Sequence, residues 1–186
     1  IFVGILIIWC SKALPNSSKP NIIIYLADDL GWKDIGFNNA KIVKTPNIDK
    51  LAHDGLQMNR FYSAPTCSPT RAALLTGINS LAVGVIRPID NPTADRYGLP
   101  LKYKIMPQFF KDAGYQTALS GKWHLGMFSD EYLPRNRGFD STYGHLGGGI
   151  GYFDHAVAGR MDWHRNGEIL YEDGYSTTLI ANEAVN

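Results

Sequence analysis

Residues 21–27 (NIIIYLA) form a short, β-branched apolar run that ends abruptly at Asp28 and Asp29. A run of this kind is typical of a strand that is covered on both faces in a parallel sheet. Parallel neighbours need crossover connections, which are usually helices. The run therefore predicts a chain in which strands and helices alternate.

The rest of the chain supplies that alternation. A helix is expected from Pro46, with Thr45 as its N-cap and Gly55 as its stop. Further helices are expected at 69–75 (ending near Gly77), at 105–113 (followed by Gly114) and from Ser176 onward, with extended segments at 56–62 and 115–119. Residues 84–100 are rich in Pro, Asn and Asp and predict a long surface loop, and 147–149 also predict a loop.

This order of elements favours an α/β fold with a mainly parallel central sheet flanked by helices. Ligands of such sheets gather at the carboxyl ends of the strands. Asp28, Asp29 and Lys122 all lie just past expected strand ends, so we expect them at this edge of the sheet.

The N-terminus predicts a secretory signal. Residues 1–9 are continuously apolar, which is too short for a membrane-spanning helix of about 20 residues. Their length fits the apolar region of a signal peptide, and Ser11 and Ala13 suit a cleavage site. We therefore interpret 1–13 as a signal peptide whose start is incomplete, with a buried N-terminal strand as the alternative. The protein is expected in the secretory pathway, lysosomal or extracellular, without a transmembrane anchor.

The cysteine count follows from this interpretation. The chain has two cysteines, and Cys10 would be removed with the signal peptide. Cys67 is then unpaired in an oxidising compartment, which marks it as reactive or intermolecular. Asn16 begins an N-glycosylation sequon just after the expected cleavage site.

The charge distribution excludes one class of partner. The formal net charge is +1, and the lysines and arginines are spread along the chain. Without a basic stripe to neutralise phosphates, nucleic-acid binding is not expected.

Cys67 precedes an expected helix, and Arg71 follows it by four residues. The helix dipole and a nearby positive charge both stabilise a thiolate. Considered alone, Cys67 could be a nucleophile, a phosphate-binding thiol or a structural cysteine beside a turn. The spacing to Arg71 does not fit the phosphatase loop.

Three segments resemble the sulfatase family. Residues 65–77 (PTCSPTRAALLTG) resemble its first signature, 114–124 (GYQTALSGKWH) its second, and 27–32 (ADDLGW) its metal-binding start. Residues 121–127 and 137–140 are most similar to arylsulfatase B and its relatives. The resemblance runs from residue 20 to 186 and implies the N-terminal portion of a longer catalytic domain with an alkaline-phosphatase-like sandwich.

The resemblance implies a sulfuric ester hydrolase in which Cys67 is oxidised to formylglycine. The formylglycine-generating enzyme, which reads the Cys-x-Pro-x-Arg core, would be a partner during maturation. One hydroxyl of the hydrated aldehyde attacks the sulfur of a sulfate ester, and loss of a proton from the other releases sulfate. The substrate implied is an aryl sulfate or a sulfated glycosaminoglycan sugar.

The resemblance also implies a role for each site residue. Asp28, Asp29 and the modified Cys67 would bind Ca²⁺, for which carboxylates are hard oxygen ligands. Arg71 would hold the hydrated aldehyde, and Lys122 would bind a sulfate oxygen. His124 would contact the substrate and transfer a proton with the diol.

Other polar residues receive no catalytic role. His53 is expected to be exposed on a helix, and His145, His155 and His164 fall in loop-like stretches. The pair Asp90-Asn91 is followed by proline and predicts a turn rather than a metal site.

Two alternative functions remain open from the sequence. One is a formylglycine-type phosphodiesterase or phosphonate hydrolase of the same superfamily. The other is a truncated, non-catalytic product that binds a sulfated glycan. The later Asp-Asn ligands, second histidine and second lysine implied by the resemblance are not in the chain, so the 186 residues alone are expected to be inactive.

Overall fold

A computed structural model describes residues 19–90 and 98–186. The expected signal peptide 1–13, the glycosylation site Asn16 and the turn residue Asn91 lie outside the described residues. The described residues divide into two units, one that ends at Leu30 and one that begins at Gly31. None of the helices in the described ranges has the length and apolarity needed to cross a membrane.

The expected strand at 21–27 is wrong, because the described part of the first unit has no regular secondary structure. Ile23 is 92% exposed, and the chain bends at Asp28 and Asp29. A strand requires a hydrogen-bonding neighbour for its backbone, and none of the described strands pairs with this segment. The apolar pattern indicates a tendency toward burial, but it does not supply that neighbour.

The first helix of the second unit confirms the predicted end signals. Helix α1 spans Pro46–Asp54, with Thr45 as N-cap and Gly55 as C-cap. The Thr45 hydroxyl accepts a hydrogen bond from the Gly36 N–H at 2.8 Å and donates to Asp49 Oδ1 at 2.8 Å. The preceding chain forms two 3-10 helices, Trp32–Asp34 and Gly36–Asn38. Residues 56–62 form no strand, contrary to the expected extended segment.

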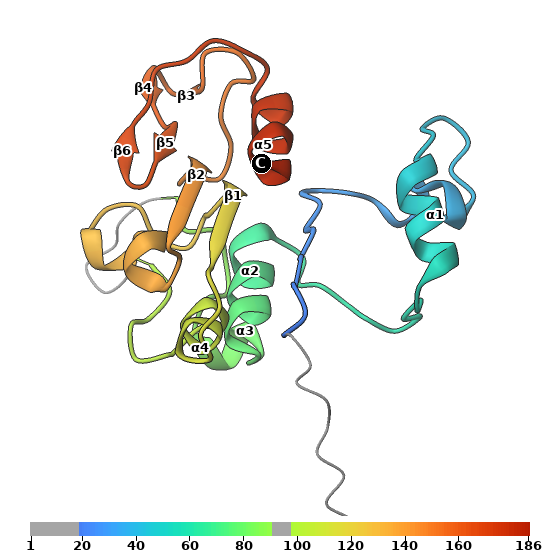
Figure 1. The fold of residues 1–186 in the computed structure, drawn as a ribbon, viewed down its shortest axis with the longest axis horizontal. Helices are drawn as coiled ribbons and strands as arrows, with labels where there is room; N and C mark the ends of the chain where they lie inside the picture. The colour runs from blue at the N-terminus through green and yellow to red at the C-terminus, as the bar shows by residue number, and fades with distance from the viewer. Residues whose placement is uncertain (1–18, 91–97) are drawn as a thin grey trace, which may run out of the picture. The chain divides into compact units, whose positions relative to one another are not determined.

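The next part of the chain forms three helices. They are α2 (Cys67–Thr76), α3 (Ser80–Val83) and α4 (Met106–Asp112), and α2 contacts both others (Figure 1). Gly77 and Gly114 follow α2 and α4 with φ of +68° and +80°, a conformation in which glycine has no Cβ penalty. The helices predicted at 69–75 and 105–113 are therefore confirmed, with α2 beginning two residues earlier.

The main sheet has four described strands in the order β1-β2-β5-β6. Strands β1 (Ala118–Lys122) and β2 (Ser141–His145) are parallel, whereas β5 (His164–Arg165) and β6 (Glu168–Ile169) are antiparallel additions. A separate hairpin pairs β3 (Ala156–Val157) with β4 (Arg160–Met161). The loop predicted at 147–149 follows β2 directly.

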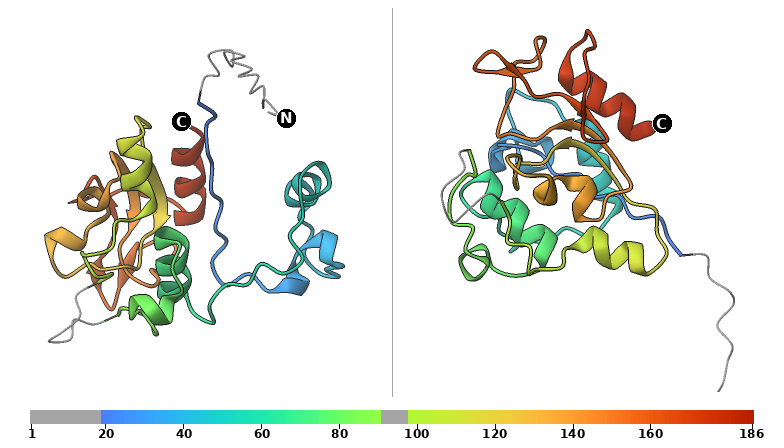
Figure 2. Two further views of the ribbon diagram at one scale, coloured as in Figure 1. Left: turned by 90° about the horizontal axis from the view of Figure 1, so that it is seen from below. Right: turned by 90° about the vertical axis from the view of Figure 1, so that its left-hand side faces the viewer.

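Helix α5 (Ser176–Val185), predicted from Ser176 onward, packs against β1 and β2 (Figures 1 and 2). The Ser120 hydroxyl of β1 donates to the Ile180 carbonyl at 2.8 Å, which joins the helix to the sheet. Two short 3-10 helices, Asp130–Tyr132 and Pro134–Arg137, lie between β1 and β2 in the sequence. The α/β class is confirmed.

Strand β1 begins three residues later than the strand predicted at 115–119. Just before the strand, Asp140 accepts hydrogen bonds from both the backbone N–H and the hydroxyl of Thr117, each at 3.0 Å. The register pairing with β2 starts at Ala118, which is opposite Ser141. The shift makes Lys122 the last residue of β1.

The expected surface loop at 84–100 is wrong in one respect, because both ends of its described part are buried. Val85, Ile89 and Leu99 lie in the same core as Trp123 and Leu125. Arg137, only 2% exposed, donates to the carbonyl oxygens of Leu99 at 2.8 Å and Tyr103 at 3.0 Å. These groups anchor an irregular segment through specific backbone contacts, which composition alone does not predict.

Candidate active site

Cys67 is the first residue of α2, and Arg71 lies one turn further along the helix. They are four residues apart and therefore share one face of the helix. Cys67 is half-buried at the first helical position, where the dipole favours negative charge. Arg71 Nη1 donates to the Lys122 carbonyl oxygen at 2.5 Å, which fixes α2 against the end of β1.

The end of β1 brings a histidine to Cys67. His124 lies two residues beyond the strand, is 2% exposed and has φ of +54°. Its Nδ1 is 3.0 Å from Cys67 Sγ. The structure therefore brings together all four predicted catalytic residues, Cys67, Arg71, Lys122 and His124, from segments more than 50 residues apart.

The Ser68 hydroxyl holds this arrangement in place. It donates to the His124 carbonyl oxygen at 2.8 Å and accepts from the Ile89 backbone N–H at 3.1 Å. Ser68 is fully buried, so breaking either bond would leave an unpaired polar group. One side chain thus ties α2, the segment after β1 and the irregular chain at Ile89 together.

Asp90 lies beside His124, which the sequence analysis did not foresee. Its Oδ1 is 3.0 Å from His124 Nε2. Burial lowers the pKa of His124, the Asp90 carboxylate raises it, and the positive charges of Lys122 and Arg71 lower it further, so that the net pKa is lowered. The ring is therefore neutral at pH 7. No local signal in the sequence links the two residues, which are 34 positions apart.

His145 also lies at this edge of the sheet, although the sequence analysis gave it no role. It is the register partner of Lys122 and is buried, with Nδ1 3.1 Å from the Gly147 carbonyl oxygen. Burial lowers its pKa to about 4, Asp162 opposes the shift, and the charges of Lys122 and Arg71 add to it. Since a carbonyl only accepts, the neutral ring donates from Nδ1.

The chain after β2 is held by a buried carboxylate. Asp162 accepts from the backbone N–H groups of Leu146 at 3.0 Å and Gly147 at 2.8 Å, and its Oδ1 is 3.0 Å from His164 Nε2. The His124 backbone N–H donates to the Leu146 carbonyl oxygen at 3.0 Å. Asp162 therefore fixes the segment on which the His124 backbone rests.

The remaining histidines are structural or solvent-facing. His155 is buried, stacks on Trp163 with ring centroids 4.6 Å apart, and has Nε2 3.0 Å from the Gly174 carbonyl oxygen. His53 has a side chain that is 89% exposed, which confirms the prediction for it.

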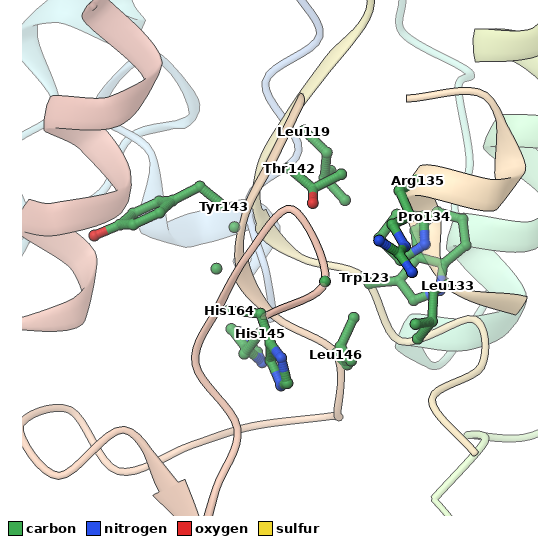
Figure 3. A pocket seen from close by; sticks show the side chains of 13 residues that line it. Leu119, Trp123, Leu133, Pro134, Arg135, Thr142, Tyr143, His145, Leu146 and His164 are labelled. Atoms are coloured by element: carbon green, nitrogen blue, oxygen red, sulfur yellow. The ribbon is translucent and has the colours of Figure 1, made fainter. Parts of the chain in front are cut away.

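A small pocket is present whose lining includes none of the four predicted catalytic residues Cys67, Arg71, Lys122 and His124. It is lined mainly by Leu119, Trp123, Leu133 and Leu146, with His145 and His164 at one end (Figure 3). In Figure 3, Tyr143 points away from Leu119 and Thr142. Since neither Cys67 nor Lys122 lines this pocket, we do not assign it as the substrate site.

Comparison with known proteins agrees with the geometry. The sulfatase family profile matches residues 20–185. The chain belongs to the sulfatase family. Mouse arylsulfatase J is 40% identical over 140 residues, and human arylsulfatase G is 42% identical over 144. These matches cover 75% and 77% of this chain but 23% and 27% of the relatives, so the chain spans about a quarter of their length.

Solved structures give the same result for the fold. The crystal structure of Ps i-CgsB is 36% identical with a TM-score of 0.81, covering 91% of this chain and 41% of that one. The PsFucS1 sulfatase from Pseudoalteromonas sp. is 39% identical with a TM-score of 0.58, covering 70% of this chain and 26% of that one. The predicted family and its α/β fold are therefore confirmed.

The predicted metal ligands of this sulfatase are divided between the two units. Asp28 and Asp29 are exposed in the first unit, and Cys67 is in the second. Within residues 19–90 and 98–186, no group of three or more His, Cys, Asp or Glu side chains is arranged to hold a metal ion. The joint role of Asp28, Asp29 and Cys67 as ligands stays a prediction.

Acid should destabilise the second unit through His145. Its folded pKa of about 4 lies below the ordinary value of 6.5, so the unfolded chain binds the extra proton first as the pH falls. Stability is complete above pH 6.5 and decreases toward pH 4 by roughly 3 kcal/mol from this group. We expect His145→Asn, which can still donate to Gly147, to show a smaller fall in melting temperature between pH 7 and pH 4 than the wild type. Equal falls would contradict the assignment.

Proposed function

We propose that the protein containing this chain hydrolyses sulfate esters with a formylglycine made from Cys67. The observation that carries the proposal is the contact between Cys67 Sγ and His124 Nδ1, at 3.0 Å, beside Arg71 and the end of β1. A nucleophile next to a candidate base and two cations is suited to group transfer from an anionic ester. Membership of the sulfatase family supports sulfate as the transferred group.

Each of the four residues would have a distinct role. Formylglycine, once hydrated, supplies a geminal diol with a hydroxyl nucleophile. Arg71, one turn along α2, would orient residue 67 and balance negative charge there. Lys122 would bind a sulfate oxygen and stabilise charge that develops in the transition state. His124 would accept a proton at Nδ1, the atom that faces residue 67.

Calcium is the metal that we propose for the site. Asp28 and Asp29 are adjacent carboxylates at a bend, and hard oxygen ligands of this type suit Ca²⁺ better than a thiophilic metal. The ion would supply positive charge to neutralise the bound sulfate. Asp28 and Asp29 would bind it together with the modified residue 67 and with further oxygen ligands, because Ca²⁺ takes six to eight.

The proposed substrate is a sulfated sugar. The mouse relative that is 36% identical to the chain is named N-acetylgalactosamine-6-sulfatase. One solved structure at 36% identity is Ps i-CgsB in complex with k-i-k-neocarrahexaose. These names support a sulfated glycan over a phosphodiester, and they leave a glycosaminoglycan as the substrate that we propose. A secretory location, with signal peptide 1–13 and a glycan at Asn16, belongs to the same proposal.

The deciding experiment is peptide mass spectrometry of residues 61–71 after secretion from cells that contain the formylglycine-generating enzyme. We expect a mass that matches an aldehyde at position 67. The purified full-length protein should then hydrolyse an aryl sulfate, and chelation of calcium should abolish the turnover. The corresponding phosphate ester should react far more slowly.

A sulfatase of known maturation, expressed in the same cells, is the control for conversion. An unmodified thiol at Cys67 beside a fully converted control would contradict the proposal and favour a non-catalytic glycan-binding product. Preference for the phosphate ester would instead favour the phosphodiesterase alternative.

A further inference from the structure

Cys67, His124 and Asp90 form a connected series of side chains. Cys67 Sγ is 3.0 Å from Nδ1 of the imidazole, and Asp90 Oδ1 is 3.0 Å from Nε2. The His124 side chain is 2% exposed, whereas that of Asp90 is 62% exposed. One nitrogen of the His124 ring therefore contacts the candidate nucleophile, and the other contacts a carboxylate that is exposed to solvent.

The carboxylate determines which nitrogen carries the proton. An ionised aspartate only accepts hydrogen bonds, so the Nε2 that faces Asp90 must be the N–H. In the neutral ring Nδ1 then has a lone pair, and that lone pair faces position 67. The opposite tautomer would place two acceptors, Nε2 and Oδ1, at 3.0 Å from each other.

The surroundings hold Asp90 and His124 in this relation. The Ser68 hydroxyl binds the His124 carbonyl and the N–H of Ile89, the residue before Asp90. On another side, a Cβ at Gly148 would lie 2.7 Å from His124 Cε1 and 3.1 Å from Asp90 Oδ1. The glycine therefore lets the backbone after β2 pack directly against both side chains.

We propose that Asp90 is a positioning residue that orients His124 so that Nδ1 accepts a proton from residue 67. The inference rests on the proposed function, since it assigns a partner to the proposed base. In this step the proton leaves the hydroxyl or thiol of residue 67 and moves to Nδ1 of His124, which becomes an imidazolium. The Asp90 carboxylate stabilises that cation through Nε2–H.

The first test uses protein that keeps the Cys67 thiol, expressed without the formylglycine-generating enzyme. Iodoacetamide is added at fixed pH, and alkylation of the Cys67 peptide is followed by mass spectrometry. In Asp90→Asn and Asp90→Ala we expect the rate to fall about tenfold, because less thiolate forms beside the ring. Asp90→Glu should retain most of the rate. Asp173→Asn, which removes an exposed carboxylate from another loop, is the matched control and should leave the rate unchanged.

The second test uses the matured full-length protein. We expect Asp90→Asn to lower kcat on an aryl sulfate by roughly 10- to 100-fold, with little change in KM, melting temperature or formylglycine content. Asparagine keeps the shape of the side chain but can donate to Nε2, so it no longer selects one tautomer. If Asp90 had only a structural role, its replacement would not lower kcat while leaving KM unchanged. Nor would Asp90→Glu then restore kcat.

The two proposals can fail separately. Equal alkylation rates in the wild type, Asp90→Asn and Asp90→Ala would overturn the role of Asp90, whatever the activity on sulfate esters. A matured wild-type protein without sulfatase activity would overturn the proposed function. The alkylation rates would still decide whether Asp90 orients His124.

Discussion

Replacement of Cys67 by alanine is expected to lower kcat/KM for an aryl sulfate by roughly 10⁴-fold or more in the full-length protein. Loss of a covalent nucleophile has effects of this size because its partners cannot substitute for it. The Cys67 side chain is half-buried and contacts His124 Nδ1, so its removal should leave the melting temperature within a few degrees of the wild type.

The control for this variant is Thr70→Ala in the same helical turn. The Thr70 hydroxyl donates to the carbonyl oxygens of Ala64 and Thr66 and belongs to the helix start rather than to the site. Its replacement should change kcat/KM by only a few fold. If Cys67→Ala kept a tenth or more of the wild-type activity, the nucleophile would have to lie elsewhere.

The largest effect on stability is expected at Gly144, the fourth of the five residues of β2. A Cβ there would lie 2.3 Å from the Gly121 carbonyl oxygen of the paired strand, and φ is +130°. Gly144→Ala therefore combines backbone strain with overpacking against an atom that cannot rotate away. We expect a loss of about 3–5 kcal/mol in the free energy of unfolding, measured by denaturant titration.

Gly159→Ala separates the two causes. Gly159 also has a positive φ, +75°, but a Cβ there would meet nothing within 4 Å. The loss there should be about 1 kcal/mol, from strain alone. Similar losses for the two variants would show that the β1–β2 pair can separate to accommodate a methyl group.

The elements that could be predicted from the sequence are those with local causes. Helices α1, α2 and α4 are marked by residues at their own ends, such as Thr45, Gly77 and Gly114. The grouping of Cys67, Arg71, Lys122 and His124 was also predicted, although by resemblance to a family rather than from spacing. Family motifs of this kind reflect tertiary contacts, which the hydrophobic periodicity of a sequence does not reveal.

The features that could not be predicted depend on distant partners. The run at 21–27 has strand character but no hydrogen-bonding neighbour among the described strands. Thr117, the residue before β1, is hydrogen-bonded to Asp140, which lies 23 residues further along the chain. Asp90 was interpreted as a turn residue, since a proline follows it closely and nothing local indicates a histidine 34 positions away. In each case composition describes the segment correctly, but a long-range contact decides its role.

The separation of 57 residues between Cys67 and His124 has a consequence for protein synthesis. At about 5–20 residues per second, the ribosome adds His124 roughly 3 to 11 seconds after Cys67. For that interval the strand end that later covers the thiol does not exist, and Arg71 lacks the Lys122 carbonyl that holds α2 in place. The nascent chain therefore presents the Cys-x-Pro-x-Arg segment uncovered for several seconds. For the proposed conversion of Cys67 to formylglycine, this delay is a period in which the thiol is accessible on unfolded chain before His124 packs against it.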